Sequence, residues 1–291
     1  MQEIRTDLAD LRVSTSVITN TAAVIRNHTI SLRDDAARQR KKDLLEWICS
    51  ADYHVQHNDY IHKRQSDTGE WFVQDARFQE WMNSERSTLF CPGIPGAGKT
   101  MMAALVIDRL LRSKHEAERP VVFVYCDYKR QSEQSTKHLL SSLLRQVVDT
   151  QEEVPSTVQD FHTAHVRRRT TPSTQEVLQV LRDVMEGLHG LTVVVDALDE
   201  CQAETCRDLL SSIEAVRNRC TVRLLATSRF LPNIQSHRVF LNEPSLEVRA
   251  SAQDLEKYVR SRISEFRSPV ASKPDLLESL VSSIVNATGG M

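Results

Sequence analysis

The sequence is poor in the features that mark membrane, secreted or nucleic-acid-binding proteins. It has only 8 Gly and 9 Pro in 291 residues, and its formal net charge is −2. A nearly neutral chain gives no global electrostatic reason to bind nucleic acid or an anionic membrane. No apolar run approaches the roughly 20 residues that span a bilayer, and the N-terminal MQEIRTDLADLRV lacks an apolar signal region. We therefore expect a globular protein with no membrane span and no nucleic-acid partner.

Signals for cysteine pairing are also absent. The six cysteines are scattered along the chain, and no two form a CxxC pair. Buried thiols in a reducing compartment are expected, rather than a disulfide framework or a zinc site. This pattern favours a cytoplasmic location.

Residues 1–44 contain neither Gly nor Pro and are expected to form a helix. Apolar and small residues recur there in alternating steps of four and three, the a/d spacing of a coiled coil, at Ile4, Leu8, Leu11, Thr15, Ile18, Ala22, Ile25, Thr29 and Leu32. Two interpretations stay open. The conservative one is a helix packed on its own protein or on a neighbouring helical domain, and the sharper one is a helix for self-association or partner binding.

Residues 45–83 hold all three Trp of the chain, together with several other aromatic residues. The DTGEW stretch predicts a turn at Thr68-Gly69, followed by a short apolar piece. Three His lie nearby at 54, 57 and 62, but their spacing fits no zinc signature, so packing or solvated histidines are expected.

From residue 84 onward, strand-like and helical stretches alternate, as in α/β proteins. The apolar, β-branched runs 88–91, 121–126, 191–196 and 222–227 are typical of parallel strands buried on both faces. Helices are expected over the ranges 99–113, 134–149, 174–188, 203–218, 252–266 and 274–285. The Arg-rich stretch 150–173 is expected to be a solvated loop. The sequence thus divides into four segments: 1–44, 45–83, an NTPase-like domain at 84–249, and the start of a helical region at 250–291.

The stretch GIPGAGKT satisfies the pattern G-x-x-x-x-G-K-[ST] between a predicted strand and a predicted helix. Glycines let backbone amides form an anion-binding concavity, and a helix N-terminus adds unpaired amides and a positive dipole end. Lys99 is expected to contact the β- and γ-phosphates, and Thr100 to contact Mg²⁺. The predicted nucleotide-binding residues are Gly93, Pro95, Gly96, Ala97, Gly98, Lys99, Thr100 and Met101.

The string LTVVVDALDE supplies the acidic partner that a phosphate loop needs. Asp196 ends an apolar strand, where its carboxylate would help to hold Mg²⁺ beside the loop. Glu200 is expected to act as a base or to orient water, and Asp199 to support the metal shell. Acidic capping of a helix N-terminus would also explain Asp199 and Glu200, but not Asp196.

The fourth strand ends in RLLATSRF. In the additional-strand class of P-loop folds, this strand lies between the loop strand and the acidic strand. That order would bring Thr227, Ser228 and Arg229 close to the γ-phosphate, where Arg229 would sense a triphosphate. Pairing of Arg229 with surface acids is the alternative.

GIPGAGKT, VVVDALDE and LLATSR, at these separations, resemble the NACHT-type NTPases of the STAND class, especially fungal and nephrocystin-like members. The G-x-W and F-x-x-W marks of residues 45–83 support the same resemblance. It implies a three-layer α/β/α P-loop fold with a parallel sheet of the additional-strand class, ATP or GTP with Mg²⁺, and slow hydrolysis in a signalling switch. Family members continue into a winged-helix region and repeats, which are not found here.

A second class of function stays open. The fold would then serve as a non-hydrolysing nucleotide-binding or scaffold protein that acts through protein contacts. A metabolic kinase or G-protein fits less well, because neither an NKxD string nor an acceptor-substrate motif occurs.

Overall fold

The computed structural model describes residues 2–113, 119–265 and 274–288, with backbone alone for residues 2–24 and for several residues in the last two helices. The chain divides into two compact units, Met1–Trp47 and Ile48–Met291. The finer division into four segments stays a prediction. No helix within the described ranges has the length and apolar character needed to cross a bilayer.

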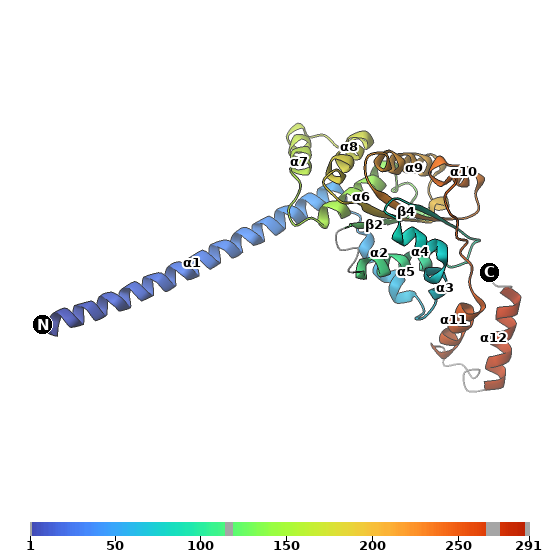
Figure 1. The fold of residues 1–291 in the computed structure, drawn as a ribbon, viewed down its shortest axis with the longest axis horizontal. Coiled ribbons are helices and arrows are strands. Elements are labelled where there is room, and N and C mark those ends of the chain that lie inside the picture. Colours follow the sequence, from blue (N-terminus) through green and yellow to red (C-terminus); the bar gives the residue numbers. More distant parts are fainter. Residues whose placement is uncertain (1, 114–118, 266–273, 289–291) are drawn as a thin grey trace. The chain divides into compact units, whose positions relative to one another are not determined.

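Helices account for most of the described structure (Figure 1). The strands are β1 (Thr88–Pro92), β2 (Val121–Tyr125), β3 (Leu191–Asp196) and β4 (Val222–Ser228). The α-helices are α1 (Gln2–Ile48), α2 (Tyr53–Lys63), α3 (Glu70–Gln74), α4 (Ala76–Asn83), α5 (Lys99–Arg112), α6 (Thr136–Asp149), α7 (Ser156–Arg168), α8 (Thr174–Met185), α9 (Ala203–Arg217), α10 (Pro232–Gln235), α11 (Ala252–Glu265) and α12 (Pro274–Thr288). Short 3-10 helices are η2 (Tyr128–Arg130), η3 (Leu198–Glu200) and η4 (Arg238–Phe240).

The four strands form one parallel sheet in the order β1-β4-β3-β2. Every strand residue is buried, which explains why the strand sequences are mostly apolar. The position of β4 between the loop strand and the acidic strand confirms the predicted additional-strand order. It also places the carboxyl ends of β1, β4 and β3 side by side, which brings their three motifs to one edge.

A further segment runs alongside β1 on its free edge. The amide of Phe90 donates to the carbonyl oxygen of Pro244 at 3.1 Å, and the amide of Leu246 donates back to Phe90 at 2.9 Å. The amide of Val248 then donates to the carbonyl oxygen of Pro92 at 2.7 Å. This parallel pairing covers the edge of β1 and holds the chain against the start of the Gly-rich loop.

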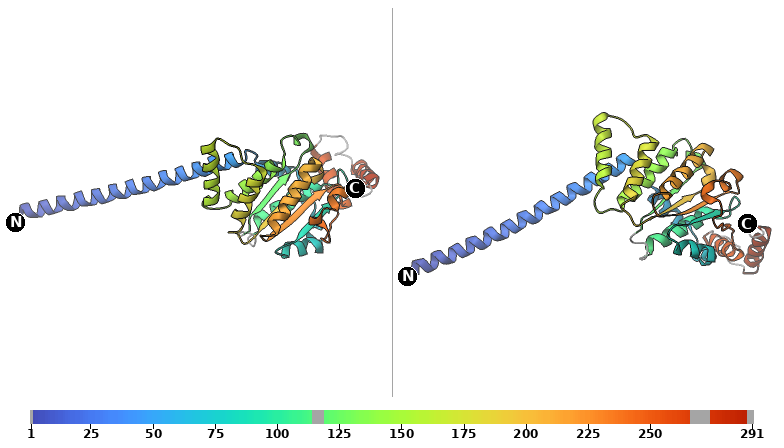
Figure 2. Two further views of the ribbon diagram at one scale, coloured as in Figure 1. Left: turned by 90° about the horizontal axis from the view of Figure 1, so that it is seen from above. Right: turned by 45° about the horizontal axis from the view of Figure 1, so that its top comes forward.

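Helices cover both faces of the sheet and make a three-layer α/β/α arrangement (Figures 1 and 2). On one face lie α2, α4 and α5, and on the other lie α6, α8 and α9. Local sequence fixes where several of them begin. In α8, for example, the Ser173 hydroxyl accepts from the amide of Glu176, whose carboxylate accepts in return from the amide of Ser173.

Residues 48–83 of the Trp-rich segment belong to the same compact unit as the sheet. The indole of Trp81 is buried and donates to the carbonyl oxygen of Leu224 in β4 at 2.9 Å. Gly69, with φ of +82°, starts α3, and its amide and the indole of Trp71 both donate to Asp254 Oδ2, at 3.0 and 3.1 Å. Gly69 and Trp71 of the G-x-W motif therefore bond this segment to α11, and Trp81 of the F-x-x-W motif bonds it to β4.

The histidines of this segment pack against aromatic residues. His57 is buried, and its Nδ1 lies 2.9 Å from the hydroxyl of Tyr125. The rings of His54 and His57 both lie against Phe123, with centroids 4.9 and 5.2 Å away. All six cysteines lie within the described residues and none forms a disulfide; five of them are buried.

The expectation of a solvated loop over 150–173 was wrong. The structure has α7 there, from Ser156 to Arg168, with Val158 and His165 buried. The apolar positions are too few to signal a helix by their spacing. The three arginines that suggested a loop lie at the C-terminal end of α7, where cations complement the helix dipole.

Candidate nucleotide-binding site

The Gly-rich loop connects the end of β1 to the start of α5. Gly96 and Gly98 have φ of +82° and +89°, values that L side chains rarely adopt, and a Cβ at either position would meet no atom within 4 Å. Gly98 is the N-cap of α5 and provides no side chain to bond the first amides of the helix. The loop therefore leaves open space around Gly96 and Gly98, next to a helix N-terminus whose first amides lack intrahelical partners, which suits an anion.

Gly93 occupies a different environment in the same loop. A Cβ on this residue would lie 2.7 Å from the carbonyl oxygen of Val248, in the segment that pairs with β1. The amide of Gly93 donates to the carbonyl oxygen of Ser228 at the end of β4, at 3.0 Å. Close backbone packing explains the glycine at this position without any phosphate contact.

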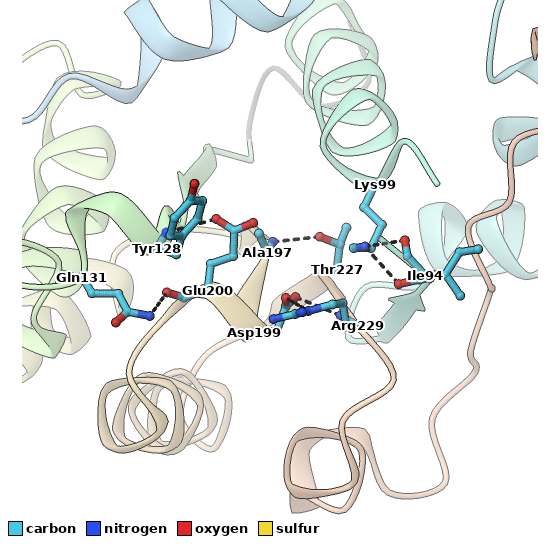
Figure 3. A network of polar contacts seen from close by, with 10 residues as sticks. Ile94, Lys99, Tyr128, Gln131, Ala197, Asp199, Glu200, Thr227 and Arg229 are labelled. Carbon is cyan, nitrogen blue, oxygen red and sulfur yellow. Dashed lines mark hydrogen bonds and ion pairs between the residues drawn. The ribbon is translucent and has the colours of Figure 1, made fainter. Parts of the chain in front are cut away.

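Lys99 extends over the loop that precedes it (Figure 3). Its Nζ donates to the carbonyl oxygens of Gly93 and Ile94, each at 3.0 Å. An ammonium has three N–H donors, so one is left for a phosphate oxygen. Burial lowers the pKa of Lys99 from its usual value, and the negative charges of Asp199 and Asp196 oppose that change.

Asp196 lies at the end of β3 and is 1% exposed. The hydroxyl of Thr227 donates to Asp196 Oδ1 at 2.6 Å and accepts from the amide of Ala197 at 2.9 Å. Burial raises the pKa of Asp196 to about 6, against the opposing effect of hydrogen bonds from Thr227 and Thr100. Thr100 and Asp196 are therefore adjacent, as they must be to serve one cation.

Asp199 holds Arg229 rather than pointing to open solvent (Figure 3). The amide of Arg229 donates to Asp199 Oδ1 at 2.9 Å, and its Nε donates to Oδ2 at 2.6 Å. The Asp199 side chain is only 4% exposed, whereas that of Arg229 is 49% exposed. Both carboxylate oxygens of Asp199 accept hydrogen bonds from Arg229, so in this structure Asp199 orients Arg229.

Glu200 lies at the end of η3 and is held through both its side chain and its backbone. Its Oε2 accepts a hydrogen bond from the amide of Tyr128 at 3.1 Å, and its carbonyl oxygen accepts from Gln131 Nε2 at 2.7 Å. Ala197 opens the turn before it in the left-handed region, with φ of +56°. Tyr128 and Gln131 follow β2, which lies next to β3 in the sheet, and no motif in the sequence marks either residue as part of the site.

These groups surround one cavity of about 670 Å³. Five of the residues predicted near the nucleotide are buried and are not among those that line the cavity, namely Gly93, Ala97, Asp196, Thr227 and Ser228, while the other predicted residues line it. The lining comprises Pro95, Gly96, Gly98, Lys99, Thr100, Met101, Tyr128, Gln131, Ala197, Asp199, Glu200 and Arg229. The Ser228 hydroxyl is buried without a hydrogen-bond partner among the described residues.

A parallel sheet of this order, with a G-x-x-x-x-G-K-T loop between its first strand and helix and an acidic end on β3, defines a P-loop NTPase domain. The family model described as "Nephrocystin 3, N-terminal" matches residues 67–229, more than half of the chain. The chain therefore belongs to this family, and it carries the NACHT-type, nephrocystin-like NTPase domain that the motifs indicated.

The chain is also similar to one protein by sequence and to several solved structures by fold. The vegetative incompatibility protein HET-E-1 of Podospora anserina is 25% identical over 209 residues, which cover 67% of this chain and 15% of that protein. Among solved structures, Cdc6p from Pyrobaculum aerophilum aligns with a TM-score of 0.47 and 13% identity, over 74% of this chain and 54% of that one. Aeropyrum pernix Orc1, solved in complex with DNA, aligns with a TM-score of 0.42 and 22% identity, over 64% and 45%.

Proposed function

We propose that this protein binds a nucleoside triphosphate, ATP in preference to GTP, together with Mg²⁺, and hydrolyses it slowly as a signalling switch in the cytoplasm. The observation that carries the proposal is the cavity itself. The Gly-rich loop and Lys99 line it together with Asp199, Glu200 and Arg229. A volume of about 670 Å³ is in the range of small-molecule sites.

The residues present fit a phosphate chain with its cation. Amides near Gly96 and Gly98 and the free N–H of Lys99 are donors for phosphate oxygens. The Thr100 hydroxyl and the Asp196 carboxylate are neighbouring oxygen donors, the kind that Mg²⁺ prefers. When bound, the cation would neutralise phosphate charge and would favour the ionised form of Asp196.

Glu200 is the residue that we assign to water activation. Its carboxylate lines the cavity, and the amide of Tyr128 fixes one of its oxygens. The other oxygen, Oε1, is the one that would accept a proton from an attacking water molecule. Arg229 would contact the γ-phosphate after leaving Asp199, so that its position reports whether a triphosphate is bound.

The signalling role rests on family membership and on the name of the relative. HET-E-1 is named as a vegetative incompatibility protein, and this chain covers 15% of its length. We infer that the present domain is the nucleotide-responsive part of such a system, in which protein partners receive the output. A scaffold that binds nucleotide without turning it over is the competing function, since Glu200 and Arg229 are both already bonded within the protein.

The test compares purified wild type with Lys99→Ala and Glu200→Gln, using calorimetric titration with MgATP and MgGTP and a phosphate-release assay. We expect Lys99→Ala to abolish binding, and Glu200→Gln to keep binding but lose turnover. Lys137→Ala removes an exposed lysine from α6 and serves as the matched control. Binding by Lys99→Ala equal to that of wild type would refute the nucleotide site. Tight binding with no turnover in wild type would establish the non-hydrolysing alternative.

A further inference from the structure

The helix α1 exposes apolar side chains that its own unit does not cover. From residue 25 to residue 43 nearly every side chain is exposed, and Ile25 and Leu32 are 61% and 56% exposed. A long helix whose apolar residues find no partner gains little from packing, although packing provides most helical stability in proteins. We propose that α1 associates with α1 of another copy of this chain, parallel and in register.

The seam that this association would bury follows the spacing of four and three already noted in the sequence. Ile25 and Leu32 fall at d positions, and Thr29 falls at the a position between them. The hydroxyl of Thr29 donates to the carbonyl oxygen of Ile25 at 2.8 Å. Because that hydroxyl is already satisfied on its own helix, the threonine methyl can enter an apolar seam without leaving an unpaired polar group.

The charges that flank the seam select the direction of the partner helix. In this heptad frame the e positions carry an almost continuous row of arginine, at Arg5, Arg12, Arg26, Arg33 and Arg40. An antiparallel pair sets e positions against e positions, which would place arginine opposite arginine along the contact. A parallel pair instead sets e against g, where the sequence carries Asp7 and Asp35, and where the one Lys or Arg, Lys42, faces Trp47 rather than an arginine. Charge complementarity therefore favours the parallel arrangement.

The same charges select the register. With the helices level, each g residue faces the e residue five positions later on the other copy. Asp7 then faces Arg12 of the partner subunit, and Asp35 faces Arg40 of the partner subunit, on both sides of the seam. If one helix is displaced along the other by one heptad, Asp–Arg pairs of this kind remain on one side of the seam only. Asp35 also bonds to Arg38 of its own helix, and its carboxylate has acceptor sites for both guanidinium groups.

Direction and register are tested by disulfide trapping in the full chain. Leu32→Cys and Asp34→Cys are compared in a Cys220→Ser background, which removes the partly exposed native thiol. Diamide takes up the two electrons and two protons when two thiols join. We expect rapid covalent dimer formation for Leu32→Cys, at a d position, and little for Asp34→Cys, at the outward f position. Equal trapping of both variants, or no trapping of Leu32→Cys, would overturn the parallel, in-register arrangement.

The seam is tested by sedimentation velocity across a range of concentrations. Burying unpaired carboxylates is costly, so Ile25→Asp combined with Leu32→Asp should weaken self-association by at least about a hundredfold. Ile30→Asp is the matched control, because Ile30 is 50% exposed but lies at a b position outside the seam. A wild-type chain that stays monomeric at all concentrations would overturn the proposal, as would equal effects of the seam and control variants. The association does not need the nucleotide site, so Lys99→Ala should leave it unchanged.

Discussion

Replacing Asp196 with Asn is expected to stabilise the nucleotide-free protein above pH 6 while weakening its binding of Mg²⁺ and nucleotide. Burial raises the pKa of Asp196 to about 6, compared with an ordinary value of 3.8. An ionised carboxylate in this position is therefore a source of instability in the protein without ligand. Asn keeps the shape, and its amide oxygen can still accept the hydrogen bond from Thr227.

The magnitude follows from the displaced pKa. A rise from 3.8 to about 6 corresponds to roughly 3 kcal/mol, at about 1.36 kcal/mol per pH unit. Below pH 4 both the folded and the unfolded state hold the proton, and the carboxyl group costs nothing. Between pH 4 and 6 the unfolded state releases its proton while the folded state keeps it, so the stability of wild type falls as the pH rises. Above pH 6 the full difference persists.

The assay is urea unfolding of wild type and Asp196→Asn at a series of pH values from 4 to 8, followed by tryptophan fluorescence. Taking the difference between the two proteins cancels every other titrating group. The variant should gain up to about 3 kcal/mol at pH 8, equivalent to about 6–12 °C in Tm for a unit of this size. A difference that is the same at pH 4 and pH 8 would show that the Asp196 carboxyl does not titrate as argued.

Three further substitutions probe the surroundings of the site by urea unfolding at pH 7. Thr227→Val should cost about 1–3 kcal/mol, because the buried amide of Ala197 loses its acceptor; a neutral effect would contradict the hydrogen-bonded role. Gly93→Ala should destabilise the fold by about 1–3 kcal/mol, since its Cβ would lie 2.7 Å from the carbonyl oxygen of Val248; an unchanged midpoint would show that this backbone yields easily. Trp81→Phe should cost about 1–3 kcal/mol through the lost indole N–H donor, and equal stability would argue that this bond is dispensable.

The sequence predicted the sheet and its order well because each strand is buried on both faces. A short apolar run bounded by turns then indicates a buried parallel strand. The order of the three motifs along the chain predicts that β4 lies between β1 and β3, as it does in the structure. The loop from Gly93 to Thr100 was equally clear, since few other structures need Gly, Lys and Thr at this spacing. Where the residue pattern is sparse, as in α7, the helix was missed.

Other parts of the site depend on contacts that no local pattern records. Gln131 reaches the carbonyl oxygen of Glu200 across 69 positions of sequence, and only the pairing of β2 with β3 brings them together. The bond from the indole of Trp71 to Asp254 likewise joins two segments whose sequences give no sign of each other. Aromatic marks in a sequence signal burial, but their partners become visible only in three dimensions.

The ion pair between Asp199 and Arg229 sets a condition on the proposed switch. Moving the guanidinium of Arg229 to a γ-phosphate would leave a carboxylate that is 4% exposed without its ion-pair partner, and an uncompensated buried charge is expensive. The backbone amide of Arg229 can stay on Asp199 while the guanidinium leaves, which retains one of the two bonds and lowers the cost. The remaining cost must come from the new contact between arginine and phosphate. A diphosphate lacks the terminal group that would supply this contact, so Arg229 should stay with Asp199 when only a diphosphate is bound. The same pair that restrains Arg229 in the free protein would thus provide the energetic basis on which the proposed switch distinguishes the two nucleotide states.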